Sequence, residues 1–503
     1  MSNQSLTDVL NTTAKFIDSS FERPVEAEFL LADYDREVFK IVKTTAQHTI
    51  TQKYINGTKL VIEGFFKVCV YYQPPMGANL TVISKKLPFQ HQIDIQGAVK
   101  PPYFINVDGG LEYVNTRAIN SSRIDVRGVY SFEVVGYNYA KTDITTAINS
   151  TTACSETENL LHFYLCGNGI RQFSIEDELD IPDNVEKIIN ITHSGNKSTV
   201  TSYQNKVNVK GSVEVDVAYM IENDMKLYHA TKTLNYNQIV DIEGTKENNT
   251  AFADFSVLNY TVTKNPDTKK TTFILSATLD VKVFEKAEII AVSDVFSKTY
   301  EYTKEVQSIV YDENLISIDR NTTVLLEDEI GEGFEHIYDF AEISSPKVIF
   351  SDENAELKSK ITFSAILKNS QGEYECFSKT GEVTFDTGEE VSEENEYLLT
   401  ADIIDSSVNI DGGTFTVKIN IGLSGVVIKR HRINTVRTFE EKTDRLLSRD
   451  GDALILYYGK KGEKLFDIAQ RYKTDVESIM EENELTEKVL IENRMLFIPA
   501  FGM

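Results

Sequence analysis

The chain has 503 residues, and at about 150 residues per domain this length predicts three or four domains. Its 51 Lys and Arg against 77 Asp and Glu give a formal net charge of −26. Because phosphate groups are bound mostly by Lys and Arg, this charge argues against nucleic acid or an anionic membrane as the main partner. Apolar residues make up 41% of the chain, enough to bury several hydrophobic cores, so wholesale disorder is excluded as well.

The N-terminal sequence and the cysteine content indicate a cytoplasmic protein. Residues 1–16 contain no basic segment followed by an apolar run, so they do not resemble a secretory signal. No run of 18 apolar residues occurs, so no transmembrane segment is expected. The four cysteines, Cys69, Cys154, Cys166 and Cys376, form no CxxC pair, and their low number in so long a chain favours a reducing compartment.

Two segments carry apolar residues at a helix-like spacing. Residues 1–23 form an N-terminal segment that we expect to be helical, because Leu6, Val9 and Leu10 recur three and four positions apart. Glu156–Cys166 is expected to form a second short helix. Most of the remaining chain before residue 451 has the pattern of strands and turns.

One strand pattern occurs three times, with alternating apolar and polar residues, which is typical of half-buried strands. The three segments are Lys59–Tyr72, Lys206–Tyr219 and Asn354–Leu367. Gly64, Gly211 and Ser359 occupy equivalent positions in them, 147 and 148 residues apart. A small residue inside a strand predicts a β-bulge or the close approach of another backbone.

A second strand pattern follows the first in every repeat. It occurs at Ile124–Val134, Phe273–Val283 and Phe415–Gly425. Turn residues such as Asp411-Gly-Gly413 separate the strands. The repeats therefore predict a mainly β protein with three tandem β-sandwich-like domains, each made of two β-layers. Their expected boundaries are 24–149, 150–304 and 305–450.

The last fifty residues change from strand to mixed structure. The pattern predicts a strand, a helix with one apolar face and a closing strand, at Leu454–Tyr458, Glu463–Tyr472 and Met495–Ile498. Between the helix and the closing strand, Thr474 and Glu477 match a capping box at the start of a second helix. Residues 451–503 are therefore expected to form a small separate β-α-α-β domain.

This C-terminal segment resembles a LysM module. The matching positions are Leu465-Phe466-x-Ile468-Ala469-x-x-Tyr472 and the final Leu496-Phe-Ile-Pro499. The resemblance implies that the loops at Gly459–Phe466 and Asn483–Ile491 form a groove, which in this family often holds N-acetylglucosamine polymers. The residues that it places in the groove are Lys460, Lys461, Glu463, Lys464, Leu485, Val489 and Ile491.

Two kinds of ligand are compatible with such a groove. The family commonly has Gly-Asp-Thr-Leu-Trp at the first turn, where this chain has Gly462-Glu-Lys-Leu-Phe466 and no Trp anywhere. Aromatic side chains in the groove would favour sugar rings. The domain offers Tyr457, Tyr458, Phe466 and Tyr472, but at least Phe466 and Tyr472 fit the buried face of the helix. The interpretation that we favour is a protein ligand, and the alternative is peptidoglycan.

The β-repeats followed by one LysM resemble the SPOCS-domain spore-coat proteins of the Clostridia. The resemblance rests on the strands with Gly64 or Gly211 at their middle and on the terminal LysM. It implies a scaffold in the mother-cell cytoplasm, at the forespore surface, whose LysM binds the coat ATPase SpoIVA and whose β-domains bind other coat proteins. The alternative is a peptidoglycan-binding protein of the spore or cell-wall surface.

No catalytic motif stands out in the sequence. Gly195-Asn-Lys-Ser-Thr199 lacks the glycine and the spacing of a phosphate-binding loop, and neither HExxH nor GxSxG occurs. The seven histidines are scattered, with no pair at metal-ligand spacing. Cys69 lies between two valines of a strand, where a buried and unreactive thiol is expected. The sequence therefore predicts no catalytic residue, cofactor or metal site, and the protein is not expected to be an enzyme.

Overall fold

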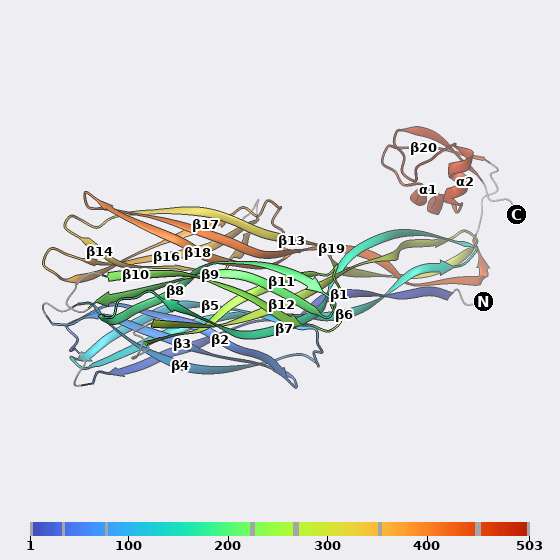
Figure 1. Ribbon diagram of the computed structural model, residues 1–503. Helices are drawn as coiled ribbons and strands as arrows, with labels where there is room; N and C mark the ends of the chain where they lie inside the picture. Colours follow the sequence, from blue (N-terminus) through green and yellow to red (C-terminus); the bar gives the residue numbers. More distant parts are fainter. Residues whose placement is uncertain are drawn as a thin grey trace.

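The computed structural model shows a mainly β protein, as the sequence predicts (Figure 1). It describes residues 4–32, 36–75, 79–221, 227–264, 271–350, 355–447 and 454–499. Strands dominate these ranges, and the helices that the described residues contain both lie in the C-terminal domain. The strands before that domain are grouped below into three modules, which together are called the β-body (residues 4–447).

The three modules follow one another along the chain. The first contains β1 (Gln4–Leu30), β2 (Lys40–Asn56), β3 (Lys59–Gln73), β4 (Thr81–Asp94), β5 (Tyr103–Asn120) and β6 (Arg123–Asn149). The second contains β7 (Ala153–Leu179), β8 (Val185–Tyr203), β9 (Lys206–Ile221), β10 (Leu227–Asp241), β11 (Thr250–Lys264) and β12 (Thr271–Ser297). The third contains β13 (Tyr300–Glu329), β14 (Glu335–Ile343), β15 (Lys347–Phe350), β16 (Ala355–Lys368), β17 (Tyr374–Phe385), β18 (Glu396–Asp411) and β19 (Thr414–Leu446).

The modules share one antiparallel strand order. One sheet of each module contains its first and its last two strands, in the orders β1-β6-β5, β7-β12-β11 and β13-β19-β18. The other sheet contains the strands between them, in the orders β2-β3-β4, β8-β9-β10 and β14-β16-β17, with β15 pairing on β16 after β14. The first sheets of the second and third modules meet through the pair Phe163 and Asp312 and so form one six-stranded sheet.

Each module is a sandwich because its strands alternate apolar and polar side chains. In the first module, Val25, Val126 and Phe132 of one sheet are buried together with Phe66 and Val68 of the other. Equivalent clusters join the two sheets of the second module and the two sheets of the third. Burial of apolar surface is favourable by about 25 cal/mol per Å², so each module has a hydrophobic core of its own.

The first and last strands of each module are longer than a sandwich requires. Four of them have 27 residues, β13 has 30 and β19 has 33, whereas a typical strand has about five or six. Their outer halves leave the sandwiches as three two-stranded ribbons that pack together into a stalk (Figure 1). The core of the stalk includes Leu10, Ile144, Leu160, Ile289 and Ile433. Because a lone two-stranded ribbon is only marginally stable, this shared core stabilises all three.

Both helices that were expected in the β-body are strands in the structure. Within the predicted helical segment 1–23, the described residues from position 4 onward belong to β1, and Glu156–Cys166 lies inside β7. Both segments pair with a neighbouring strand. Register shifts between Leu6 and Thr7, and again after Lys15, interrupt the alternation of β1, which gives its apolar residues a helix-like spacing.

The small residue at the middle of the repeated strand coincides with a break in the neighbouring strand. Beside Gly64 the register of β2 shifts, and a Cβ atom at Gly64 would lie 2.4 Å from the carbonyl oxygen of Thr49. The register of β8 shifts beside Gly211 as well. Next to Ser359 the break is wider, because β14 ends there and β15 begins. The predicted bulge and close backbone approach are therefore both present.

A buried ionic cluster joins the modules where the stalk leaves the sandwiches. Arg430 of β19 lies 3.1 Å from Asp312 and 2.7 Å from Glu396. The Nζ of Lys15 in β1 lies 3.2 Å from Glu396, and the hydroxyl of Tyr137 in β6 donates a hydrogen bond to the same carboxylate. These contacts tie the first module to the third. Asp312, Arg430 and Glu396 are largely buried, whereas Lys15 is partly exposed, so removing one of the three buried partners would leave another unpaired.

Candidate partner-binding site

The C-terminal domain has the predicted β-α-α-β order. β20 (Leu454–Gly459) and β21 (Arg494–Pro499) form a two-stranded antiparallel sheet, and α1 (Leu465–Tyr472) and α2 (Val476–Glu482) cover one of its faces (Figure 1). The core between them includes Leu465, Ile468, Ile479, Leu490, Leu496 and Ile498. The apolar face that the sequence predicts for the first helix is therefore the face that packs into this core.

The start of α2 differs from the prediction of a capping box. Asp475 is the N-cap residue, and its side chain makes no capping hydrogen bond. The hydroxyl of Thr474 donates instead to the carbonyl oxygen of Pro499, at 3.1 Å. The carboxylate of Asp475 faces the β-body, where the Nζ of Lys298 lies 2.6 Å away. The predicted cap residue Thr474 and the actual N-cap residue Asp475 therefore both have tertiary partners instead of capping contacts.

Backbone hydrogen bonds hold the two predicted groove loops side by side. The N–H of Gly462 donates to the carbonyl of Leu490 at 2.7 Å, and the N–H of Leu490 donates to the carbonyl of Glu463 at 3.0 Å. Lys464 and Val489 form a β-bridge between the same loops. The structure thus brings the first-loop residues of the predicted groove against the second loop.

Three of the four first-loop residues lie at the surface of the domain with different partners. Lys460 and Lys461 are exposed, and neither has a carboxylate within ion-pair distance in the described part of the chain. Glu463 accepts hydrogen bonds from the hydroxyl of Tyr457 and from the N–H of Lys460, and these bonds lower the pKa of its carboxyl. Glu463 therefore shapes the loop, while the two lysines can meet a ligand.

The fourth first-loop residue belongs to a contact with the tip of the stalk. The Nζ of Lys464 lies 2.9 Å from Glu156 of β7, and this hydrogen-bonded ion pair raises the pKa of the lysine. Nearby, the ring of Phe296 packs against the ring of Phe466, with centroids 5.3 Å apart. Together with the ion pair of Asp475, these contacts fix the helical side of the domain on the β-body.

The second-loop residues differ in their exposure. Leu485 is half-buried and packs against the core of the domain. Val489 is 44% exposed and Ile491 is 74% exposed. Leu485 therefore supports the fold of the loop, whereas Val489 and Ile491 present apolar surface to solvent.

Four exposed apolar side chains lie on the outer face of the sheet. None belongs to the predicted groove set, although Tyr458 is among the aromatic residues that the sequence offers for binding sugar. The four side chains form two cross-strand pairs, Leu456 with Phe497 and Tyr458 with Met495. Their exposed fractions lie between 44% and 61%. A signal for them is present in the sequence, because both strand segments are apolar at successive positions instead of alternating as a half-buried strand does.

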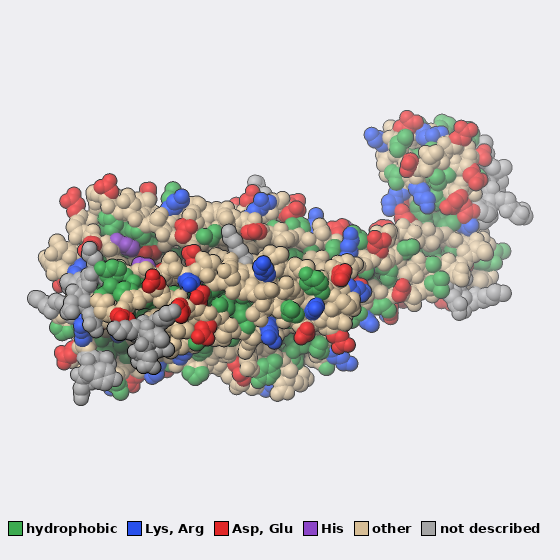
Figure 2. Space-filling model, in the orientation of Figure 1, with side chains coloured by type: hydrophobic (Ala, Val, Ile, Leu, Met, Phe, Trp, Pro, Cys, Tyr) green, Lys and Arg blue, Asp and Glu red, His purple; other side chains and the backbone are tan. Residues whose placement is uncertain are grey.

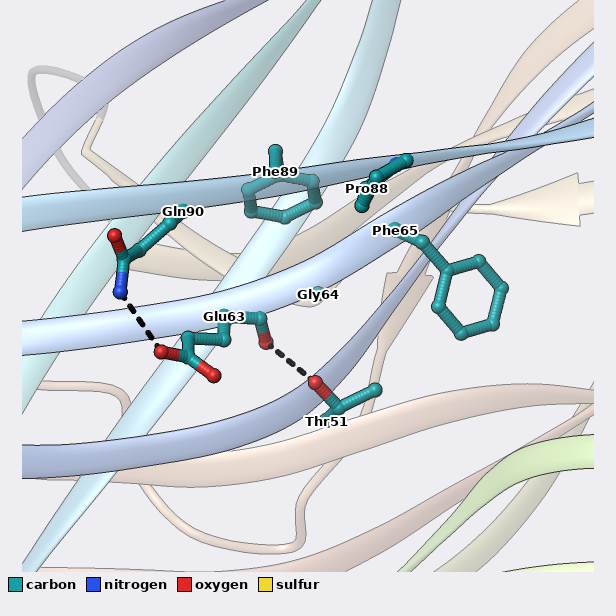
Figure 3. Close-up of a pocket in the computed structure, with 7 residues that line it drawn as sticks. All are labelled: Thr51, Glu63, Gly64, Phe65, Pro88, Phe89 and Gln90. Carbon is teal, nitrogen blue, oxygen red and sulfur yellow. Dashed lines mark hydrogen bonds between the residues drawn. The ribbon is translucent and has the colours of Figure 1, made fainter.

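A shallow hollow lies beside Gly64 in the first module (Figure 3). The residues that line it are Thr51, Glu63, Gly64, Phe65, Pro88, Phe89 and Gln90. The carboxylate of Glu63 accepts a hydrogen bond from the Nε2 of Gln90 at 2.8 Å, and its backbone carbonyl accepts one from the hydroxyl of Thr51 at 3.2 Å. These bonds link neighbouring strands, and the side chains that line the hollow offer no pair of nucleophile and base.

The thiols of the β-body are in unreactive surroundings. Cys69 is buried, as expected, and burial raises the pKa of its thiol. Burial likewise raises the pKa values of Cys154 and Cys166 to about 12.

Among the described residues, no group of three or more His, Cys, Asp and Glu side chains is placed to hold a metal ion. None of the helices in those ranges has the length and apolar character to cross a membrane.

Comparison with protein families supports both resemblances found in the sequence. The family model described as SipL, SPOCS domain, matches residues 37–119 and 184–265, which span β2 to β5 and β8 to β11. The LysM domain model matches residues 460–499. Searches among curated proteins and among solved structures found no match. Both families are binding domains, and they indicate a sporulation coat protein with a peptidoglycan-binding type of module. The chain therefore combines segments that match the SPOCS domain with a C-terminal segment that matches the LysM domain, and so matches a SipL-like SPOCS plus LysM protein.

Proposed function

We propose that the chain is a non-catalytic scaffold of the spore coat that works in the mother cell, at the forespore surface. Its LysM domain binds a SpoIVA-like coat ATPase through the two groove loops, and its β-modules bind other coat proteins. The combination of SPOCS and LysM domains supports the coat assignment. The choice of a protein ligand for the LysM groove rests on the side chains described next.

The observation that carries this choice is the composition of the groove loops. The exposed predicted residues are three lysines and two aliphatic side chains, Lys460, Lys461, Lys464, Val489 and Ile491, and of these Lys464 is paired with Glu156 of the stalk. Sugar pockets are lined with aromatic faces, but the one aromatic residue of these loops, Phe466, is only 6% exposed and packs on Phe296. Aliphatic and basic side chains suit an apolar protein surface bordered by carboxylates.

The shape of the molecule supports a linking role. The sandwiches lie at one end of the stalk, and the LysM domain is fixed at the other end (Figure 1). Binding regions at both ends of one body can hold two partners near each other. Linkage of this kind raises the effective concentration of one partner at the other, so that several weak contacts act together.

The experiment that tests the proposal is a binding assay on the full chain with two purified targets, a SpoIVA-like coat ATPase and insoluble peptidoglycan. We expect the ATPase to bind, and Ile491→Asp to weaken this binding at least tenfold. Leu325→Asp is the matched control, because Leu325 is 64% exposed on the β-body and far from the groove loops in sequence. Capture by peptidoglycan alone would instead assign the chain to the glycan-binding class.

A further inference from the structure

We propose that the outer face of the β20–β21 sheet is a docking surface for a short amphipathic protein segment that presents apolar side chains beside carboxylates. This outer sheet face consists of Leu456, Tyr458, Met495 and Phe497. The inference rests on the proposed function, because it assigns a second contact surface for the protein partner of the LysM domain, separate from the groove loops.

The first observation is that the small sheet is apolar on both faces. Its inner face contributes Ile455, Tyr457, Leu496 and Ile498 to the core beneath the helices. A sheet with one covered face normally presents polar side chains on the other. Here the open face carries four large apolar side chains in two cross-strand pairs, so they border one another on a single surface. A contiguous exposed apolar patch of this kind marks an interaction site.

The second observation is that the described part of the β-body does not cover this face. The contacts with the stalk come from the helical side, through Phe466 on Phe296 and Asp475 on Lys298. The helices therefore lie between the sheet and the stalk, and the strands face away from the β-body (Figure 1). The LysM domain therefore buries its helical side against the stalk and leaves the outer sheet face open to a partner.

The size of the face argues for a short segment as its occupant. Four side chains of this size, each about half exposed, present on the order of 400 Å². A stable dimer interface buries about 800 Å² on each partner. Two copies of the chain stacked through this face would fall well short of that area, whereas a helix or strand of a partner can cover it.

Charge defines the chemistry of the segment and argues further against a second copy. Three basic side chains, those of Lys460, Lys461 and Arg494, lie at the turn end of the two strands, and none has a carboxylate within ion-pair distance in the described ranges. Residues 454–503 carry seven Lys and Arg and nine Asp and Glu, a net charge of −2, so −24 of the total −26 lies elsewhere in the chain. Acidic side chains are spread over the visible face of the β-body (Figure 2). Two such bodies would repel each other, while carboxylates on a partner segment would meet the three basic side chains.

The first arm of the test measures binding of the full chain to a purified SpoIVA-like ATPase. The sheet-face variant Tyr458→Ser/Phe497→Ser should bind at least tenfold more weakly than wild type and keep the wild-type unfolding temperature, because both side chains are exposed. Leu325→Ser should bind like wild type. If the sheet-face variant keeps its affinity while Ile491→Asp loses it, the inference is wrong and the proposed function stands.

The second arm does not need the ATPase. The full chain is used to select from a phage library of random 16-residue peptides, and the selected peptides are then measured on the sheet-face variant. We expect peptides that combine apolar residues with Asp and Glu, and we expect them to lose at least tenfold in affinity on the variant. Peptides that bind both proteins equally, or no selection at all, would overturn the inference.

The two arms separate the failure of the inference from the failure of the proposed function. If the ATPase does not bind wild type but the peptides depend on the outer sheet face, the docking surface is supported and its partner is another protein. Self-association of wild type in sedimentation, lost in the sheet-face variant, would overturn the inference, because the occupant would then be a second copy.

Discussion

The ring of Phe296, at the end of β12, lies edge-on to the ring of Phe466 in α1, with centroids 5.3 Å apart and an interplanar angle of 67°. Phe296 is fully buried and belongs to the same cluster as the core of the LysM domain. A strand of the second module therefore contributes a side chain to the core of the C-terminal domain. This contact couples the stability of the LysM domain to the tip of the stalk.

The coupling predicts that Phe296→Ala lowers the stability of the LysM domain. Truncation of a buried Phe costs about 3–5 kcal/mol, and here the lost contacts are those that anchor the domain. Calorimetry should show the LysM transition at a lower temperature, while the main transition of the sandwiches stays in place. Phe350→Ala is the matched control, since Phe350 is 49% exposed on the β-body. A LysM transition unchanged by Phe296→Ala would mean that the domain folds without help from the stalk.

The ionic cluster at Arg430 predicts a pH dependence in the acid range. Burial, helped by the nearby Glu396, raises the pKa of Asp312 to about 6 from its ordinary value of 3.8, against the lowering effect of Arg430. Because the folded pKa exceeds the unfolded one, the folded protein binds the proton more tightly, and stability falls as the pH rises from about 4 to 6. A shift of about two units corresponds to about 3 kcal/mol. The free energy of unfolding of Asp312→Asn relative to wild type should therefore rise by most of this amount over that window.

His48 should change the pH dependence of stability in the opposite direction and serves as the control. Burial lowers its pKa from 6.5 to about 4, and its Nδ1 lies 3.0 Å from the hydroxyl of Tyr130. The unfolded chain takes up the proton first, so this residue makes the protein less stable as the pH falls from 6.5 to 4. In urea titrations at each pH, the free energy of unfolding of His48→Gln relative to wild type should rise as the pH falls, whereas that of Asp312→Asn should decrease. Parallel trends in the two variants would contradict both assignments.

The close backbone approach at Gly64 predicts a sharp difference between two glycines of the same module. Gly64→Ala would place a Cβ atom 2.4 Å from the carbonyl oxygen of Thr49, so the strands must separate, at a cost of about 2 kcal/mol. At Gly110 nothing lies within 4 Å of the added atom, so Gly110→Ala should leave the unfolding temperature almost unchanged or raise it slightly. Equal unfolding temperatures for the two variants would show that the strands can move apart freely at Gly64.

The sequence predicts most of what is local and repeated in this fold. The alternation of apolar and polar residues predicts the strands around Gly64 and Gly211, because one face of each strand is buried in the sandwich to which the strand belongs. It fails in β1 and β7, because bulges shift the register and because their outer halves are buried by other modules, not by their own. Of the residues with helix-like spacing, Leu10 is buried in the stalk, whereas Leu6 is 51% exposed, so the spacing does not mark one buried face.

In the candidate site, too, the local features could be predicted from the sequence and the contacts between distant segments could not. The loops and the helix around Leu465 follow from local sequence, since most of the LysM core lies within fifty residues, although Phe296 of the stalk belongs to it as well. The partners of Lys464 and Asp475 could not be predicted, because Glu156 and Lys298 are more than 170 residues away in the chain. Local sequence assigns Thr474 and Glu477 to a capping box, and the tertiary contact of the neighbouring Asp475 replaces it.

The groove loops predict opposite outcomes for two similar substitutions. Ile491→Asp places a carboxylate on a side chain that is 74% exposed, so the LysM domain should unfold at its wild-type temperature while binding of the coat ATPase weakens at least tenfold. Leu485→Asp buries part of a charge against the core, so it should lower the unfolding temperature of the domain through loss of packing and desolvation of the carboxylate. Calorimetry and a binding titration on both variants separate the two effects. Loss of stability in Ile491→Asp, or full binding by it, would remove Ile491 from the partner-binding surface and leave the outer sheet face as the remaining candidate.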